Sequence, residues 1–349
     1  MNVSLPPTSP ARGRLRAAVA LALAASLVLA GCGGDDKSED KNADRPHSQP
    51  TQGGTTLAAV WPLTGLPAPS RTPDHPVMVV KIDNTTSSTP QIGVGRADLV
   101  VEELVEGGIT RLAAMYYSKI PPVVGPVRSM RASDIGVVKA THAVLVASGA
   151  APPTYRRLQH ADVRYRDGGA GYYREGSRSA PYNLMVRLRE LVRTLDGKAI
   201  VPANYLPWGE ESDYAGSGRA HHLSVRFSPA VTTVFAYDKK SGTYANTNSH
   251  AAKGDRFKAD SVLVLRVREG DAGYLDPGGN RVPETLFYGT GDMLLFHDGK
   301  VLRGSWHKKE RSSPLELRTK AGKVKVPAGH VWIELLPNDR SGGSVRWSK

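Results

Sequence analysis

The sequence has only one cysteine among its 349 residues, so it cannot form an intramolecular disulfide. It also lacks any long apolar run beyond the extreme N-terminus, which excludes a polytopic membrane protein. Neither a Gly-X-Y repeat nor a sustained heptad pattern is present, which excludes collagen-like and coiled-coil proteins. With 40% hydrophobic residues, the chain is long enough for two domains of ordinary size.

Signatures of common enzyme classes are also missing. The sequence contains no Walker A run, no G-x-S-x-G elbow, no S-x-x-K followed by K-T-G and no H-E-x-x-H. The run Gly93-Val94-Gly95 has Asp98 where a dinucleotide loop needs its third glycine. The ten histidines are scattered, and the adjacent His221 and His222 would point to opposite faces of a strand. We therefore predict no cofactor and no metal site, and we assign no catalytic residue.

The N-terminus has the features of an export signal. Arg12, Arg14 and Arg16 precede an apolar segment from Ala17 to Ala30, which is too short to span a membrane. That segment ends in Leu29-Ala30-Gly31-Cys32, which resembles the lipobox of bacterial lipoprotein precursors. The alternative is an ordinary secretory signal with an incidental cysteine. We predict a lipoprotein signal peptide over 1–31 and lipidation of Cys32, which also removes the only thiol as a nucleophile.

The segment that follows Cys32 is too polar to bury a core. From Gly33 to about Val60 it consists mainly of Gly, Asp, Lys, Ser, Asn, Gln, Thr and Pro. We expect residues 32–60 to be a lipidated, disordered tether that holds the folded part about 30 Å from its anchor. The predicted location is the extracytoplasmic face of the cell membrane.

The chain is basic, with 46 Lys and Arg against 33 Asp and Glu. The predicted signal peptide contains three Arg and no acidic residue, so the mature protein keeps a net charge of about +10. The anions within reach of an exported protein are lipid headgroups, anionic wall polymers and acidic envelope proteins. We predict such partners and no nucleic acid; the alternative is that the charge only solvates the surface.

Residues 61–215 alternate between strand and helix patterns. Strands are predicted over 77–82, 111–117 and 143–148, where apolar and β-branched residues are bounded by turn residues. Helices are predicted over 130–140, 154–159 and 184–195, where apolar residues recur at helical spacing. This mixture predicts a layered α/β domain with a mixed sheet over 61–215.

Residues 216–349 show no helical pattern. Short alternating strands are predicted over 223–227, 231–237, 261–267, 293–297, 301–306, 323–326 and 331–336. Asp298-Gly299 between two of them predicts a type I′ hairpin, because both central residues of that turn need a positive φ. We predict a smaller all-β domain over 216–349, structurally separate from the first and joined to it near 205–222.

Charged and amide residues gather at the predicted ends of elements in the first domain. The segments that carry them are 82–84, 102–111 and 124–131, and the residues are Asp83, Asn84, Glu102, Glu106, Arg111, Arg128 and Arg131. Binding sites of α/β folds lie at such strand ends. If Ser129 caps a helix, Arg128 and Arg131 stand near free backbone N–H groups and form an anion site. The alternative is that these charges pair with one another in internal salt bridges.

The same segments carry a family resemblance. The motifs are Pro62-Leu63-Thr64-Gly65-Leu66, Ile82-Asp83-Asn84, Gln91 with Gly93, Ala97-Asp98, 106–111, 124–129 with Arg131, Ala180-Pro181 with Asn183, Asp298-Gly299-Lys300, Gly304 with Trp306, and 327–337. Together they resemble the YerB-like family of bacterial lipoproteins over nearly all of 61–340. The resemblance implies two adjoining domains of unknown function on a lipid-anchored envelope protein, and it adds Asn183 to the candidate ligand-binding residues.

Two positions depart from the family pattern. Tyr182 stands where the family usually has a histidine, and Ala150-Ala151 stands where it tends to have Gly-Ser. If the family used that imidazole or hydroxyl in catalysis, this chain would be impaired, which favours a binding or scaffold module with an anionic-ligand pocket. Two other hypotheses stay open: an enzyme on wall polymers that uses Asp83, Glu102 or Glu106 as acid or base, and a purely structural envelope protein.

Overall fold

The computed structural model describes residues 59–69, 72–195, 200–338 and 342–349. The predicted signal peptide, Cys32 and nearly all of the predicted tether lie outside the described residues. Within the described ranges, no helix is both long and apolar enough to cross a membrane.

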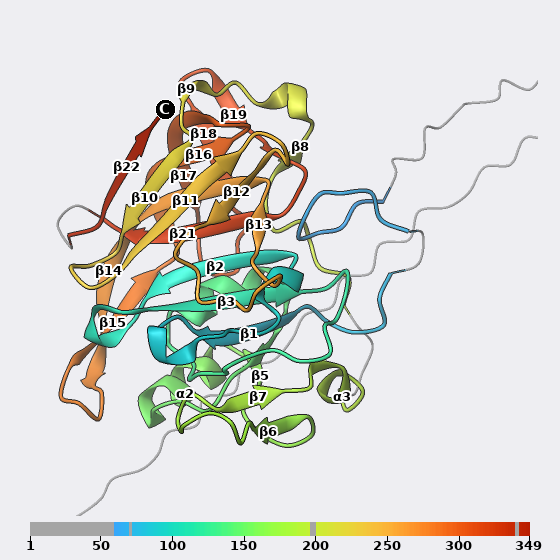
Figure 1. Ribbon diagram of the computed structural model, residues 1–349, viewed down its shortest axis with the longest axis vertical. Coiled ribbons are helices and arrows are strands. Elements are labelled where there is room, and N and C mark those ends of the chain that lie inside the picture. Colours follow the sequence, from blue (N-terminus) through green and yellow to red (C-terminus); the bar gives the residue numbers. More distant parts are fainter. Residues whose placement is uncertain (1–58, 70–71, 196–199, 339–341) are drawn as a thin grey trace, which may run out of the picture. The chain divides into compact units, whose positions relative to one another are not determined.

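A mixed sheet of thirteen strands forms the centre of the fold (Figure 1). Its main path runs β19-β18-β17-β16-β14-β21-β2-β3-β1-β4-β5, with β15 beside β14 and β9 beside β17. The strands of the first half are β1 (Met78–Asp83), β2 (Leu99–Leu104), β3 (Thr110–Tyr116), β4 (Val144–Val146) and β5 (Arg164–Arg166). Those of the second half are β9 (Ser217–Arg219), β14 (Ser261–Leu275), β15 (Arg281–Leu286), β16 (Gly289–His297), β17 (Lys300–Lys308), β18 (Glu316–Thr319), β19 (Gly322–Val324) and β21 (Val331–Pro337).

A second sheet of five strands packs on one face of the main sheet. Its order is β13 (Lys258–Ala259), β12 (Thr243–Asn246), β11 (Thr232–Asp238), β10 (His222–Arg226) and β22 (Ser344–Ser348). Phe235 and Tyr244 of this sheet share a buried cluster with Val100 and Trp332 of the main sheet. We call this side of the main sheet its sheet face. Two small sheets complete the strands: β6 (Tyr172–Arg174) with β7 (Leu184–Val186), and β8 (Trp208–Gly209) with β20 (Val326–Pro327).

Helices cover part of the opposite face of the main sheet, which we call its helix face. They are α1 (Asp134–Val138) and α2 (Pro152–His160), whose Val137 and Leu158 share a buried cluster with Val79 and Val101. The third helix, α3 (Leu188–Val192), packs instead with the cluster of the sheet face. Helices are thus fewer and shorter than the predicted α/β layering implied, and most described elements are strands.

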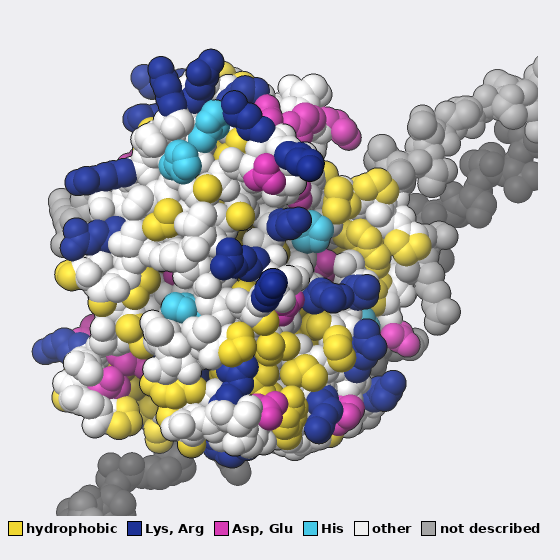
Figure 2. All heavy atoms as spheres, in the orientation of Figure 1, with side chains coloured by type: hydrophobic (Ala, Val, Ile, Leu, Met, Phe, Trp, Pro, Cys, Tyr) yellow, Lys and Arg dark blue, Asp and Glu magenta, His cyan; other side chains and the backbone are white. Residues whose placement is uncertain are grey.

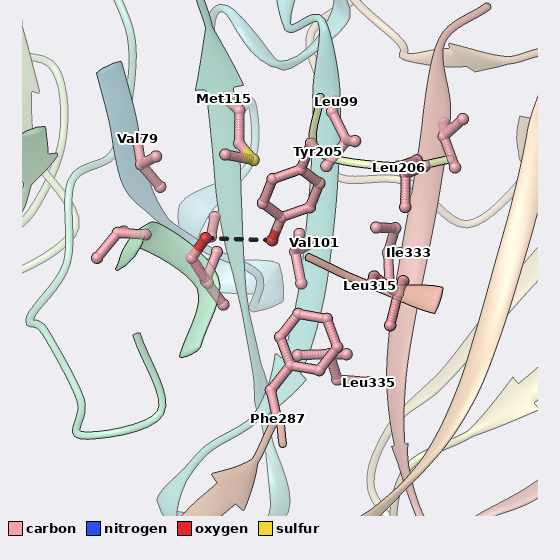
Figure 3. Close-up of a cluster of buried hydrophobic side chains, with 14 of the residues drawn as sticks. Val79, Leu99, Val101, Met115, Tyr205, Leu206, Phe287, Leu315, Ile333 and Leu335 are labelled. Carbon is pink, nitrogen blue, oxygen red and sulfur yellow. Dashed lines mark hydrogen bonds between the residues drawn. The ribbon is translucent and has the colours of Figure 1, made fainter. Parts of the chain in front are cut away.

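The prediction of two structurally separate domains is wrong. β2 of the first half pairs in parallel with β21 of the second half, so one sheet continues through both. Figure 3 shows that the buried cluster on the helix face also comes from both halves. Val101 and Met115 lie there with Ile333, Leu335 and Phe287. Cutting the chain at residue 215 would therefore expose a shared core and two unpaired sheet edges.

Several predicted elements are confirmed. Strands occupy the predicted places at 77–82, 111–117, 261–267 and 331–336, and α2 covers 154–159. The Asp298-Gly299 turn joins β16 to β17, and both residues have positive φ values of 47° and 66°. The predicted helix over 184–195 is wrong at its start, because residues 184–186 pair with β6 as the strand β7.

The predicted helix over 130–140 begins only at Asp134. The backbone before it is extended because it bonds to neighbouring strands and loops: Arg128 N–H donates to Lys81 O at 2.9 Å and Met130 N–H donates to Gly149 O at 2.9 Å. Ser129 therefore does not cap a helix, and the predicted helix N-terminal anion site does not exist. The five residues of α1 are also too few for a strong N-terminal dipole.

Candidate functional site

The candidate residues of the first half gather at one edge of the main sheet. β1 runs parallel to β4, and both β1 and β2 run antiparallel to β3, so β1, β2 and β4 end at the same edge. Asp83 is the last residue of β1, Glu106 follows β2, and Ser148 follows β4. We call this the carboxyl edge. Crevices outside the carboxyl ends of strands are the usual ligand sites of α/β sheets.

Asp83 holds two arginines at this edge. Its Oδ2 lies 2.9 Å from Nε of Arg128 and 3.5 Å from Nη2 of Arg111, its register partner on β3. Its Oδ1 accepts hydrogen bonds from the backbone N–H and the hydroxyl of Thr85 at 2.8 and 2.5 Å. Burial lowers the pKa of Arg111 to about 10; the charge of Asp83 opposes this shift, and the charges of Arg128 and Arg131 add to it.

Glu106 and Arg131 form a bidentate pair beside this group. Nε of Arg131 donates to Oε2 of Glu106 at 2.7 Å, and Nη2 donates to Oε1. Burial works against both charges, but the hydrogen bonds and mutual attraction outweigh it, so the pKa of Glu106 is lowered and that of Arg131 is raised. We call these five residues, Asp83, Glu106, Arg111, Arg128 and Arg131, the arginine cluster. Its three guanidinium groups face two carboxylates, which leaves one positive charge in excess.

A pocket of about 590 Å³ opens beside the arginine cluster. It lies between the loop before α2 and the end of the β14–β15 hairpin, which Figure 1 shows beside α2. Tyr274 of the hairpin and Thr154 of α2 are joined by a hydrogen bond of 2.8 Å between their hydroxyls. We call it the edge pocket; its lining residues are Glu106, Ser129, Arg131, Ser148, Gly149, Ala150, Ala151, Pro152, Tyr155, Tyr274, Leu275, Asp276, Pro277 and Val282.

The charged groups in the lining of the edge pocket are the guanidinium of Arg131 and the carboxylates of Glu106 and Asp276, and most other lining residues are apolar. Arg131 uses three of its five N–H donors on Glu106 and on Met130 O, so two remain. The hydroxyls of Ser129 and Ser148 lie 3.4 Å apart in the same lining. The start of α2 offers little, because its first two residues are prolines without an N–H. The first two residues of α2 therefore supply no backbone donor to an anion.

Asn84 and Glu102 lie away from the arginine cluster, on the sheet face. Side chains alternate along a strand, so Glu102 points to the sheet face and Glu103 to the helix face. Nδ2 of Asn84 donates to Glu102 Oε1 at 3.0 Å, and the hydroxyls of Thr110 and Thr233 also donate to Glu102, at 2.7 and 3.0 Å. Burial raises the pKa of Glu102 although these bonds oppose it.

Asn183 has a different partner. Its Oδ1 accepts a hydrogen bond of 2.6 Å from Nη1 of Arg174. It is near the arginine cluster only through its neighbours, because Arg128 lies 5.2 Å from the ring centre of Tyr182 and donates to Pro181 O at 3.4 Å. The eight predicted residues thus divide into the arginine cluster, the Asn84–Glu102 pair and Asn183.

Sequence reasoning missed four fully buried acidic and basic residues. Lys81 contacts Glu103 and Asp134 on the helix face, and Glu334 of β21 lies beside Glu102 on the sheet face. All four side chains are fully buried. A charged residue inside an apolar strand, such as Lys81 in MVVKID, was the available signal.

Two family models match the chain. "Protein of unknown function (DUF3048) N-terminal domain" matches residues 63–201, and the corresponding C-terminal domain matches residues 223–333. The chain belongs to the YerB-like DUF3048 family. This confirms the resemblance seen in the sequence motifs, and it describes the chain as two family domains even though they share one sheet.

A curated relative and a solved structure agree with this assignment. The chain is 26% identical over 290 residues to the "Putative lipoprotein YerB" of Bacillus subtilis (strain 168), a match that covers 79% of this chain and 86% of that protein. The crystal structure of the YerB protein from Bacillus subtilis matches with a TM-score of 0.68 at 21% identity, covering 82% of this chain and 99% of that one. At this identity the structural match shows the common fold.

The positions where this sequence departs from the family pattern both border the site. Ala150 and Ala151 line the edge pocket, and Tyr182 lies beside Arg128. The carboxylates of the enzyme hypothesis are all engaged: Asp83 with arginines, Glu102 with hydroxyls and an amide, and Glu106 with Arg131. The geometry therefore favours binding over acid–base chemistry at these residues.

Proposed function

We propose that the protein is a binding module of the cell envelope, held at the extracytoplasmic face of the membrane by a lipid on Cys32. Its edge pocket takes a ligand that carries a carboxylate or phosphate group, such as a fragment of an anionic wall polymer or an acidic segment of an envelope protein. The lipobox-like stretch and the description of the Bacillus subtilis relative as a lipoprotein support the anchor.

The observation that carries the proposed ligand is the charge excess of the arginine cluster. Three guanidinium groups share two carboxylates here, and burial, followed by the charges of Arg128 and Arg131, lowers the pKa of Arg111 to about 10 although the charge of Asp83 opposes the shift. An anion in the edge pocket would meet the unused N–H groups of Arg131 and the hydroxyls of Ser129 and Ser148, while the carboxylate of Asp276 in the same lining would oppose it. Arginine suits this role because its planar fork binds carboxylate and phosphate in two parallel hydrogen bonds.

The test exploits the Glu106–Arg131 pair. Glu106→Gln removes the carboxylate that competes for Arg131, so it should strengthen binding of an anionic ligand by about tenfold, the equivalent of one charge-assisted bond. Arg131→Gln in the Glu106→Gln background keeps a neutral hydrogen-bonding pair and should abolish binding. Titration calorimetry with a glycerol phosphate oligomer and with an acidic wall stem peptide measures both effects and separates the two sources of the anion.

Thermal unfolding of each variant is the control for folding. If neither anion binds the parent protein or the Glu106→Gln variant, the cluster is an internal network and the proposed ligand is wrong. Equal binding by the double variant would place the site elsewhere.

The anchor gives a separate prediction. Cys32→Ala removes the only thiol that can accept lipid, so the variant should leave the membrane fraction or remain unprocessed. Cys32→Ser, which keeps a polar side chain but no thiol, should lose the membrane anchor in the same way. The effect is large because two or more acyl chains bind a bilayer far more tightly than one. Fractionation of cells with detection of the protein measures it, and normal membrane retention of a processed Cys32→Ala protein would contradict the prediction.

A further inference from the structure

A second pocket, of about 340 Å³, lies between the two family domains on the sheet face. Seven of its lining residues carry a hydroxyl or a carboxamide. We call it the Thr/Asn pocket; its lining residues are Asn84, Thr85, Thr86 and Ile109 of the first domain and Ala230, Val231, Thr232, Thr233, Asn246, Asn248 and His250 of the second. Its volume is within the range of small-molecule sites.

The lining of the Thr/Asn pocket carries no formal charge at neutral pH. None of its residues is Lys, Arg, Asp or Glu, and burial lowers the pKa of His250 although the charge of Asp83 opposes the shift. The carboxylates behind the wall, Asp83 and Glu102, are held by arginines and by hydroxyl and amide donors respectively. An ion that entered would lose its hydration without gaining a counter-charge in the lining.

The walls of this pocket are fixed by their own hydrogen bonds. Asn84 uses both donors on Glu102 and Thr110, and its Oδ1 accepts from Gln91 at 3.0 Å. Across the pocket, Oδ1 of Asn246 accepts from Asn248 N at 3.1 Å, and Nδ2 of Asn248 donates to Thr232 O at 2.7 Å. The side chains are therefore positioned before any ligand arrives, which lowers the entropy lost on binding.

Some polar groups in the lining remain unused. Nδ2 of Asn246 and the hydroxyl of Thr232 have no hydrogen-bond partner among the residues that the structure describes. Asn246 lines the pocket and is only 5% exposed, so little of its side chain is in contact with bulk solvent. An apolar ligand would leave these groups unpaired, at a penalty that a hydroxyl- or amide-bearing ligand avoids.

We propose that the Thr/Asn pocket binds an uncharged ligand rich in hydroxyl and amide groups, of the chemistry of an N-acetylated amino sugar. This site is independent of the edge pocket and of its proposed anionic ligand. A ligand in this pocket would contact both family domains, because Thr232 and Asn246 come from one domain and Thr86 from the other.

The test is a titration of the full chain with the neutral tetramer of N-acetylglucosamine. Binding is monitored by calorimetry and by the amide chemical shifts of the protein. Asn246→Asp keeps the Oδ1 acceptor that Asn248 needs, but it replaces the free donor with a negative charge. It should weaken binding by at least tenfold. Thr232→Val removes one hydroxyl and nearly keeps the shape of the side chain. It should weaken binding by about threefold or more, because one hydrogen bond between uncharged groups is lost.

Thr243→Val is the matched control, because Thr243 lies in the same sheet with its hydroxyl 2.8 Å from that of Ser241, outside the pocket. It should leave binding unchanged. The Glu106→Gln, Arg131→Gln double variant should also bind the tetramer normally, so failure of the edge pocket proposal and failure of this one are distinguishable. Absence of saturable binding to the parent protein, or unchanged binding by folded Thr232→Val and Asn246→Asp variants, would overturn the inference.

Discussion

Replacing Lys81 with methionine is expected to lower the free energy of unfolding by about 3 to 5 kcal/mol, because it leaves two buried carboxyl groups without their cation. Nζ of Lys81 lies 2.5 Å from Oε1 of Glu103 and 2.8 Å from Oδ1 of Asp134, and all three side chains are fully buried. Glu103 comes from β2 and Asp134 begins α1, so the ammonium group ties two strands of the sheet to the helix that covers them.

The protonation of this triad follows from its burial. Burial raises the pKa of Glu103 to about 7, with the charge of Lys81 opposing the shift. Burial lowers the pKa of Lys81, but the two carboxylates outweigh it and raise the pKa overall. The lysine therefore stays charged in the native state, and its removal leaves Oε1 of Glu103 and Oδ1 of Asp134 buried without their cation, although Oδ2 of Asp134 still accepts from the backbone N–H of Arg131.

Urea unfolding followed by circular dichroism measures the effect, with two matched variants beside it. Lys300→Met breaks an ion pair whose side chains are 51% and 48% exposed, so its effect on stability should be much smaller than that of Lys81→Met. The triple variant Lys81→Met, Glu103→Leu, Asp134→Leu removes all three charges together and should recover most of the lost stability. A Lys81→Met protein within about 1 kcal/mol of the parent would contradict this account.

The triad also shows what the sequence can and cannot predict. Strand β1 is evident from its apolar run, and Lys81 within it is visibly anomalous. Its partners are not evident, because Glu103 is reached only through the pairing of β1 with β3 and of β3 with β2. The pattern of residues sets the face on which each side chain lies, whereas the order of strands decides which charges meet.

The same limit explains the wrong domain prediction. Hairpins such as β16–β17 are local, and the Asp298-Gly299 turn predicts them. The pairing of β2 with β21 joins residues 99–103 to residues 331–335, and no turn residue marks a parallel pairing of that kind. The arginine cluster was predictable as a set of charges at strand ends, but its pairing pattern and the position of its pocket depend on the β14–β15 hairpin from the other half.

That distant pairing places a second buried carboxyl group beside Glu102. Glu102 of β2 and Glu334 of β21 are register partners on adjacent parallel strands, and both are fully buried. As a carboxylate, which can only accept, Glu334 has no well-formed hydrogen bond among the described residues; the indole N–H of Trp332 favours its charged form only weakly. As a carboxylic acid it can donate to Glu102. Burial and then the charge of Glu102 raise the pKa of Glu334 well above its usual value, so Glu334 carries the proton that the pair shares.

Glu334→Gln should therefore make the protein less sensitive to rising pH. Above the unfolded-state pKa of 4.5 the unfolded chain releases the Glu334 proton and the native state keeps it, so stability of the parent falls as pH rises. The slope for one such proton is about 1.4 kcal/mol per pH unit, and glutamine, which donates to Glu102 without titrating, has none. The variant should be no more stable than the parent at pH 5, and it should gain on the parent by about 2 to 3 kcal/mol between pH 5 and pH 7. Urea unfolding of both proteins across this range measures the difference.

Glu102→Gln is the informative companion, because it disturbs an acceptor of hydrogen bonds from Asn84, Thr110 and Thr233 and should destabilise the fold at every pH. A difference between Glu334→Gln and the parent that stays constant with pH would show that Glu334 ionises as an ordinary carboxylate and that the pair shares no proton.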